Sequence, residues 1–391
     1  EEIQNSPIVI LVGSTIEQAA RMRASDIHIE PLETRIRVRF RIDGMLMEHS
    51  TYPINMLSAI VARVKIIGGM DISEKRKPQD GRITHVVDRT EYDIRVSILP
   101  TVYGEKIVMR LTSKMTLTKE KSRLGFSPRE LEQFDKILQN PNGIILVTGP
   151  TGSGKSTTLY TALSELNKED VNIITVEDPV EANIDGINQV QVNPKAEMTF
   201  AAALRSILLQ DPDIIMIGEI RDAETASIAV TASITGHLVV STLHTNSAAS
   251  TISRLADMGI EPYLIADATV GVIAQRLVRR LCDCKREKLA SNAEKKQLGV
   301  PEQEELRICA PCGCNQCNET GYRGRIGVYE IMRVTNRLKH AISRSCDAAE
   351  IERIALADGM STLKMSAARL VREGITSIAE LKRIAYSNED Q

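Results

Sequence analysis

Polar and apolar residues alternate with a period of two along the first third of the chain. Between Arg35 and Ile42, four arginines alternate with four apolar residues, and the run ends at the turn-forming pair Asp43-Gly44. Because successive side chains of a strand point to opposite faces, this pattern predicts a half-buried strand. The segments 25–30, 92–98 and 106–111 are predicted to be further strands, and 56–68 is predicted to be a helix. Residues 1–112 therefore read as a small α+β module.

Residues 113–123 differ from the segments on either side. They are polar and show no clean periodicity, so we expect a linker between two domains. After this linker, short apolar runs alternate with helix-like stretches, and the apolar runs fall at 143–148, 172–176, 213–217 and 237–243. That alternation predicts a parallel sheet covered by helices. The second domain is predicted to span 124–391, with a Cys-rich element at 276–330 and a helical part at 331–391.

A glycine-rich loop joins the apolar run 143–148 to a helix that is predicted to begin near Ser156. Residues 149–156 read Gly-Pro-Thr-Gly-Ser-Gly-Lys-Ser, which matches the pattern G-x-x-x-x-G-K-[ST] in full. In this pattern the backbone N–H groups converge on the phosphates, Lys155 neutralises the β and γ phosphates, and Ser156 offers its hydroxyl to Mg²⁺. The predicted strand and helix argue against an accidental glycine-rich turn. The predicted ATP-binding residues are Gly149, Thr151, Gly152, Ser153, Gly154, Lys155, Ser156 and Thr157.

Two carboxylates are predicted to lie at the ends of neighbouring strands. Glu219 ends the apolar run 214–217, although Gly218 occupies the position where Asp is commonly found. Glu219 is the preferred catalytic carboxylate. Glu177 ends the strand that follows the phosphate-loop helix, where it could act as general base or order the waters of the metal. The alternative for residues 177–181 is a solvated acidic loop.

Two histidines flank the predicted strand 238–243. A lone histidine in this position is more often a hydrogen-bonded core residue than a catalyst, and this interpretation suits His237. His244 lies between Leu243 and Thr245 at the strand end. It is the better candidate for sensing the γ-phosphate.

Composition limits the class of protein. Hydrophobic residues make up 42% and charged residues 26%, as in soluble globular proteins. The net charge is −2, and aromatic residues make up only 3%, so we expect no nucleic-acid partner. No apolar run reaches membrane-spanning length and no signal peptide precedes the first module, which predicts a cytoplasmic protein. The chain does not begin with Met, which is compatible with the loss of a natural N-terminal segment.

Several motifs together resemble the secretion ATPase superfamily. The phosphate loop is followed by Glu-Asp-Pro at 177–179, Gly-Glu-Ile-Arg-Asp at 218–222 and Thr-Leu-His-Thr-Asn at 242–246, in the order found in that superfamily. Segments 24–31 and 41–44 resemble its N-terminal module. Over essentially its whole length the chain resembles a type IV pilus assembly ATPase or its close relative, the type II secretion ATPase. Segments 187–193 and 201–206 are more similar to the pilus branch.

This resemblance implies an architecture and a task. It implies a RecA-like P-loop ATPase domain of the α/β class, a smaller N-terminal α+β (PAS-like) domain and a Cys-rich zinc-type insertion. It further implies a homo-hexamer that powers pilin polymerisation by pushing on an inner-membrane platform protein, docked to the inner face of that membrane through its partners. The alternatives are a type II secretion ATPase, a nucleic-acid translocase, and a nucleotide-binding scaffold without turnover.

The resemblance also implies that arginines of the N-terminal module reach the nucleotide when the site closes. By motif position these are Arg95 and Arg110. Arginines that arrive only in a closed state can contribute about 10³ to 10⁵ in rate. The alternative is that both are exposed strand charges. Asp26, His28 and Glu30 share one strand face, and we expect a subunit contact there rather than a metal site, because three ligands on one flat strand rarely close a metal shell.

The cysteines form one cluster. Six of the seven lie between Cys282 and Cys317, which in a reducing compartment indicates metal binding. The pair Cys314 and Cys317 resembles the second half of the family's four-cysteine zinc element, whereas Cys282 and Cys284 stand one residue closer together than its first half. The predicted zinc ligands are therefore Cys282, Cys284, Cys314 and Cys317, with Cys309 or Cys312 as substitutes and reduced free thiols as the alternative.

Overall fold

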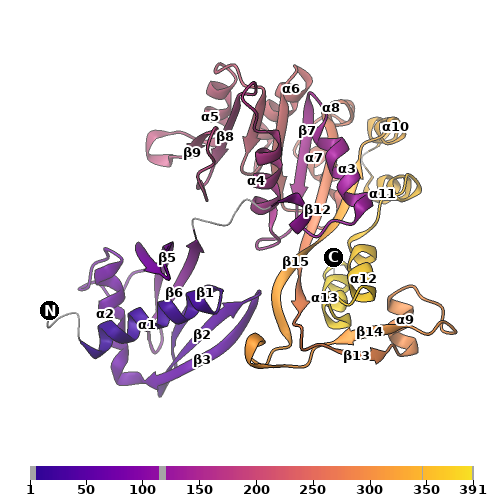
Figure 1. Ribbon diagram of the computed structural model, residues 1–391. Helices are drawn as coiled ribbons and strands as arrows, with labels where there is room; N and C mark the ends of the chain where they lie inside the picture. Colours follow the sequence, from indigo (N-terminus) through magenta and orange to yellow (C-terminus); the bar gives the residue numbers. More distant parts are fainter. Residues whose placement is uncertain (1–5, 114–119, 346, 390–391) are drawn as a thin grey trace. The chain divides into compact units, whose positions relative to one another are not determined.

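The computed structural model describes residues 6–113, 120–345 and 347–389. The chain divides into two compact units, residues 1–116 and 117–391 (Figure 1). Residues 114–119 of the predicted linker lie outside the described residues. No helix within the described residues is long and apolar enough to cross a membrane.

The first unit is one antiparallel sheet with two helices. The sheet has six strands in the order β3-β2-β1-β6-β5-β4. The strands are β1 (Ala24–Pro31), β2 (Arg35–Ile42), β3 (Met45–Pro53), β4 (Gln79–Val87), β5 (Thr90–Thr101) and β6 (Gly104–Ser113), and the helices are α1 (Pro7–Arg21) and α2 (Leu57–Ile67). These bounds confirm the predicted strands at 25–30, 35–42, 92–98 and 106–111 and the predicted helix at 56–68.

Alternation along the strands separates the two faces of this sheet. In β2 the apolar residues Ile36, Val38 and Phe40 are buried, whereas the arginines between them remain partly exposed. The buried residues pack with those of α1 and α2 into one apolar core. The opposite face of the sheet carries most of its charged side chains, because a period of two places them there.

The second unit contains a seven-stranded sheet in the order β15-β12-β7-β11-β10-β8-β9. All neighbouring strands are parallel except the pair β12 and β15. The strands are β7 (Gly143–Thr148), β8 (Ile173–Glu177), β9 (Asn188–Gln191), β10 (Ile214–Ile217), β11 (Leu238–Leu243), β12 (Thr269–Leu281) and β15 (Tyr322–Arg333). The predicted α/β fold with a parallel sheet is confirmed.

Helices cover both faces of this sheet, so its central strands are buried throughout. Ile144 and Leu146 of β7 belong to one apolar cluster, and Ile145 and Val147 belong to the cluster on the opposite face. Every residue of β7 is buried, which explains its continuous apolar sequence. The helices up to β12 are α3 (Pro128–Leu138), α4 (Lys155–Leu166), α5 (Phe200–Ile207), α6 (Ala223–Ile234), α7 (Ala248–Asp257) and α8 (Pro262–Ala268).

The Cys-rich segment is inserted between two strands of the main sheet. Residues 276–281 and 322–330, at the two ends of the predicted Cys-rich element, lie in β12 and β15. Between them a small antiparallel pair and one short helix form, namely β13 (Arg286–Leu289), β14 (Arg307–Ala310) and α9 (Asn292–Gln297). The chain then ends in α10 (Asn336–Arg344), α11 (Ala348–Ala357), α12 (Leu363–Arg372) and α13 (Ile378–Glu389).

Candidate active site

The glycine-rich loop lies between the end of β7 and the start of α4. Gly149, Gly152 and Gly154 all have positive φ, at 150°, 79° and 89°. A Cβ atom at Gly149 would lie 2.5 Å from the carbonyl oxygen of Gln275 and 2.6 Å from Oγ of Ser153. Only glycine permits this close approach of backbone to backbone. The sequence therefore folds here into the tight loop that the motif requires.

Lys155 and Ser156 begin the helix that follows this loop. The Lys155 ammonium donates hydrogen bonds to the carbonyl oxygens of Gly149, at 2.7 Å, and of Pro150, at 3.0 Å. Burial lowers the pKa of Lys155 to about 8. The Ser156 hydroxyl donates to Oε1 of Glu181 at 3.0 Å. The loop thus places a cation and a hydroxyl side by side at the helix N-terminus.

Glu219 lies just beyond β10 and contacts Arg221 of its own motif, 218–222, and His244 of the motif at 242–246. Its carboxylate forms an ion pair with Arg221 and lies 3.6 Å from Nε2 of His244. The side chain of Glu219 is 15% exposed, whereas that of His244 is 51% exposed and can be reached from solvent. Gly218 leaves room for the neighbouring strand, since a Cβ there would lie 3.3 Å from Cα of Glu177. The structure thus brings Glu219 and His244 together.

His237 lies at the other end of β11 from His244. Its Nδ1 is 3.0 Å from the carbonyl oxygen of Ala232, and the side chain is partly buried. This position agrees with the interpretation of His237 as a hydrogen-bonded structural residue.

Glu177 and Glu181 differ in their surroundings although both belong to one acidic segment. Glu177 is 4% exposed, and both of its carboxylate oxygens accept hydrogen bonds, from Tyr160 on one side and from Thr175 and Gln189 on the other. Glu181 is exposed and faces Ser156. The oxygens of Glu177 thus already have donors, and its role as general base or in ordering the waters of the metal stays a prediction. Glu181 is the acidic residue of this segment that faces the phosphate loop.

Buried polar residues that the sequence analysis did not single out connect the phosphate loop to the rest of the sheet. The side-chain amide of Gln275 donates to the Ser153 carbonyl oxygen at 2.8 Å. Thr148 accepts from the backbone N–H of Thr245 at 2.8 Å, which ties β7 to the segment after His244. No local sequence pattern marks Gln275, because its strand, β12, reaches the loop only through pairing with β7.

These residues fit a triphosphate with Mg²⁺. Gly149, Gly152 and Gly154 place no side chain in the loop, and Oγ of Ser153 is buried without a hydrogen-bond partner in the described part of the chain. Ser156 and Glu181 supply the hard oxygen donors that Mg²⁺ prefers. When bound, the metal would neutralise charge on the phosphate oxygens.

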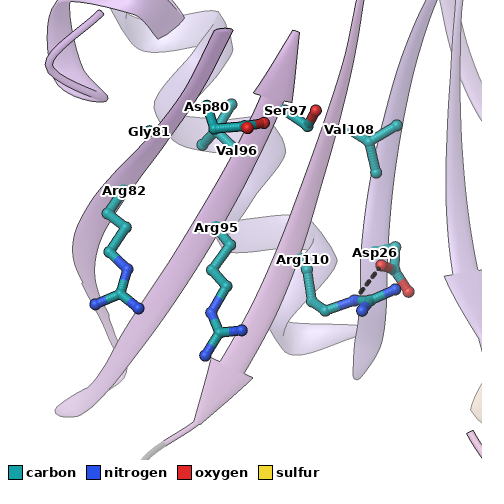
Figure 2. A pocket seen from close by; sticks show the side chains of 9 residues that line it. All are labelled: Asp26, Asp80, Gly81, Arg82, Arg95, Val96, Ser97, Val108 and Arg110. Carbon is teal, nitrogen blue, oxygen red and sulfur yellow. Dashed lines mark hydrogen bonds and ion pairs between the residues drawn. The ribbon is translucent and has the colours of Figure 1, made fainter. Parts of the chain in front are cut away.

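A row of arginines crosses the outward face of the sheet in the first unit (Figure 2). Arg82 of β4 is paired with Arg95 of β5, Arg95 with Arg110 of β6, and Arg110 with Asp26 of β1. These side chains line a cavity of about 520 Å³. Arg110 forms an ion pair with Asp26 at 3.0 Å, whereas Arg82 and Arg95 have no ion-pair partner within the described residues.

Like charges directly opposite each other destabilise a sheet, so a bound anion would stabilise this row. Nε of Arg95 is buried and has no hydrogen-bond partner in the part of the chain that the structure describes. A free guanidinium is well suited to a phosphate, because its planar N–H groups match the oxygen geometry. Arg95 and Arg110 were predicted by motif position, whereas Arg82 was not, because only the strand register shows that it continues their row.

Glu30 forms a second charged cluster on the same face. Its carboxylate accepts from Arg37 at 2.9 Å and from Arg39 at 2.6 Å, and Lys106 lies 3.7 Å away. These contacts hold the pKa of Glu30 below its usual range despite partial burial, which acts in the opposite direction. His28 lies 3.8 Å from the same carboxylate. The acidic residues of β1 therefore bind arginines and a lysine of neighbouring strands within the sheet.

Four cysteines converge at the ends of β12 and β15. The Sγ atoms of Cys282 and Cys314 lie 3.8 Å apart, as do those of Cys314 and Cys317, and Cys284 lies 3.9 Å from Cys317. Tetrahedral zinc with bonds of about 2.3 Å requires sulfur separations near 3.8 Å. The four thiols therefore fit a structural zinc ion. The shortened spacing of Cys282 and Cys284 does not prevent both from joining the cluster.

The fold and the site together define a class of protein. A mostly parallel sheet whose inner strand β7 leads into this phosphate loop, with Glu219 just beyond the nearby strand β10, defines a P-loop nucleoside triphosphatase. The chain belongs to the family described as type II/IV secretion system proteins, whose model matches residues 1–383. Its activity is the hydrolysis of ATP.

Characterised relatives extend this assignment. The type IV pilus assembly ATPase PilB of Myxococcus xanthus is 50% identical over 384 residues, which cover 96% of this chain and 68% of the relative. The type II secretion system ATPase E of Vibrio cholerae is 47% identical over 385 residues, covering 98% and 76%. The ATPase DotB of Legionella pneumophila has a similar fold, with a TM-score of 0.71 over 97% of this chain and 96% of that one, at 22% identity.

Proposed function

We propose that this chain is the motor ATPase of a type IV pilus assembly machine and works as a homo-hexamer. The observation that carries the proposal is the 50% identity over 384 residues to the pilus assembly ATPase of M. xanthus. The second candidate is a type II secretion ATPase, which is supported by the 47% identity to the V. cholerae protein. Both tasks use the same chemistry and differ in the partner that receives the force.

Residues in and around the phosphate loop have separate tasks in ATP binding and hydrolysis. Backbone N–H groups around Gly152 and Gly154 bind the phosphates, and Lys155 neutralises their charge. Ser156 and Glu181 would hold the Mg²⁺ that accompanies the nucleotide. Glu219 orients the attacking water and accepts its proton, and His244, 3.6 Å from that carboxylate, responds to the γ-phosphate. The energy of hydrolysis then changes how the two units of the chain are oriented.

The arginine row supplies charge that reaches the nucleotide only in the closed state. Arg95 and Arg110, together with Arg82, contact the phosphates and stabilise charge that develops during transfer. Two of these guanidiniums, those of Arg82 and Arg95, have no ion-pair partner within the described residues, and this supports the proposal. Opening of the site would move these arginines away from the phosphates, and hydrolysis is thereby coupled to movement.

The proposed partner is a platform protein in the inner membrane, and the ATPase docks at the cytoplasmic face through it. A zinc ion bound by the four thiols of the Cys-rich insertion would have a structural role, because four thiolates leave no open position for catalysis. No nucleic acid is expected. Aromatic residues, which stack bases, make up only 3% of the chain, and its net charge is −2.

Deletion of the gene in its own organism tests this assignment. We expect surface pili, measured by shearing and immunoblotting of pilin, to disappear while the set of secreted proteins stays unchanged. The wild-type gene should restore the pili, and a gene that carries Lys155→Ala should not. Loss of secreted proteins from cells that keep their pili would identify the type II secretion ATPase instead. Strong, salt-sensitive stimulation of ATP hydrolysis by DNA would contradict both assignments.

A further inference from the structure

A buried hydrogen-bond cluster lies next to the acidic loop that follows β8. Tyr160, on the phosphate-loop helix α4, is 1% exposed, and Glu177, at the end of β8, is 4% exposed. The Tyr160 hydroxyl donates to Oε1 of Glu177, and Thr175 donates to Oε2 at 2.7 Å. In the described part of the chain no cation forms an ion pair with Glu177. The carboxylate therefore depends on neutral donors, and each of these bonds is costly to lose.

Gln189 of β9 connects the same carboxylate to the backbone of the loop. Its side-chain nitrogen donates to Oε2 of Glu177 at 3.0 Å and to the carbonyl oxygen of Ala182 at 2.9 Å. Its side-chain oxygen accepts from the N–H of Ile184 at 2.8 Å. The cluster thus restrains the loop on the side that faces β9.

Tyr160 restrains the loop from the side of the phosphate-binding helix. Its hydroxyl accepts from the backbone N–H of Glu181 at 3.2 Å, while the Glu181 carboxylate accepts from Ser156. Ser156 and Tyr160 are four residues apart on α4 and therefore share one face of the helix. One helix face contacts both the backbone and the side chain of Glu181.

We infer that Tyr160 and Glu177 are positioning residues, which hold the Glu181 loop so that its carboxylate stays against Ser156. This inference rests on the proposed role of Ser156 and Glu181 at the nucleotide. Glu177 acts as a fixed acceptor and takes no part in proton transfer. Burial, followed by the bond to Glu177, raises the pKa of the Tyr160 phenol well above its usual range, so Tyr160 stays a donor at every working pH.

The first test is amide hydrogen exchange of the nucleotide-free protein. Tyr160→Phe removes the acceptor of the Glu181 N–H and one donor to Glu177. We expect exchange in peptides that cover residues 178–184 to become about three- to tenfold faster, as for the loss of one hydrogen bond. The matched control is Tyr322→Phe, which removes another buried hydroxyl, bonded to Oγ of Ser377 at 2.7 Å, in the Cys-rich region. This control should leave the exchange of the loop unchanged.

The second test asks whether Tyr160 acts through Glu181. We expect Tyr160→Phe to raise the Mg²⁺ concentration for half-maximal binding of a fluorescent ATP analogue about three- to tenfold. In a Glu181→Ala background the same substitution should have no further effect, because the group that it positions is gone. The Tyr322→Phe control should again behave like the wild type.

Two results would overturn the inference. One is unchanged exchange at residues 178–184 in Tyr160→Phe, and the other is an equal rise in the Mg²⁺ requirement with and without Glu181. The exchange measurement needs no nucleotide, so it tests the inference even if the chain fails to bind ATP. Failure of the wild-type protein to bind the analogue would contradict the proposed function. The exchange result alone would then test the inference.

Discussion

Three glutamates near the phosphate loop show how the surroundings of a side chain decide its role. Glu177 is buried among neutral donors, Glu181 is exposed and faces Ser156, and Glu219 lies between Arg221 and His244. Glu177 ends strand β8, Glu181 lies in the loop that follows it, and Glu219 lies just beyond β10, so position in the sequence does not show these different surroundings. Glu219 is partly exposed and has both an arginine and a histidine beside it, which supports its proposed role in orienting water.

Replacing Glu219 should separate ATP binding from hydrolysis. Glu219→Gln keeps the shape of the side chain and removes its basicity, so we expect ATP binding to persist and phosphate release to fall about 10²- to 10⁴-fold. Fluorescent-nucleotide binding and a phosphate-release assay measure the two steps. Glu224→Gln is the control, because Glu224 is exposed and pairs only with Arg205 among the ion pairs of the described residues. Near-wild-type phosphate release from Glu219→Gln would remove this residue from its role.

Lys155 should make nucleotide binding dependent on pH. Its pKa is lowered to about 8 by burial, and only the protonated amine neutralises phosphate charge. Bound phosphates favour the charged form and raise this pKa, so binding above pH 8 requires proton uptake. We expect affinity to fall by up to about tenfold per pH unit above 8 and to be nearly constant between 6.5 and 7.5. Lys155→Ala should bind weakly with no such slope, and the same slope in that variant would contradict the assignment.

At the scale of elements, β12 and β15 show how the Cys-rich insertion is supported. The two strands pair over most of their length in the main sheet, and the insertion extends from their ends. Arg279 of β12 donates to the buried Glu380 of α13 at 2.8 Å, and Lys285 donates to the Gly374 carbonyl oxygen at 2.7 Å. The C-terminal helices therefore fix the base of the insertion. The four clustered thiols bring the two ends of the insertion together.

The thiol cluster should bind one zinc ion per chain, held by Cys284 in spite of its unusual spacing. We expect Cys284→Ser to reduce the zinc content, measured by elemental analysis, and to lower the melting temperature by several degrees, since metal binding contributes to folding. Cys309→Ser is the matched control, because Cys309 lies on β14 outside the group of four and should change neither quantity. Equal zinc loss in both variants would show that Cys309 takes part in ligation.

At the scale of the whole molecule, the arginine row and the phosphate loop belong to different compact units. Each unit has its own apolar core, so each can move as a body while its site residues keep their places. In the proposed function, the first unit supplies charge that is needed only during hydrolysis, and the second unit binds the nucleotide.

Removal of Arg95 should therefore reduce the rate of hydrolysis far more than the stability of its unit. We expect Arg95→Ala to lower kcat by about 10³-fold or more, with a smaller change in nucleotide affinity. Arg37→Ala is the control, because Arg37 lies on the same face of the sheet and pairs with Glu30. It should keep nearly full activity. Comparable losses of kcat in the two variants would indicate a general effect of surface charge.

The sequence determined the features that depend on local order along the chain. Alternation with a period of two predicted the strand at 35–42, and continuous apolar runs predicted the buried strands of the second unit. The phosphate loop could be recognised from the sequence because its glycines, lysine and serine all lie within residues 149–156. The family motifs were readable for the same reason.

Tertiary structure decided what depends on register and on pairing between distant segments. Arg82 joins Arg95 and Arg110 only because three antiparallel strands align at these positions. Cys284 reaches Cys317, and Gln275 reaches Ser153, only after strands pair across large separations in the chain. A one-residue shift in register would turn Arg82 or Gln275 to the opposite face of its sheet, and the sequence of one strand does not show which residue of another strand lies beside it.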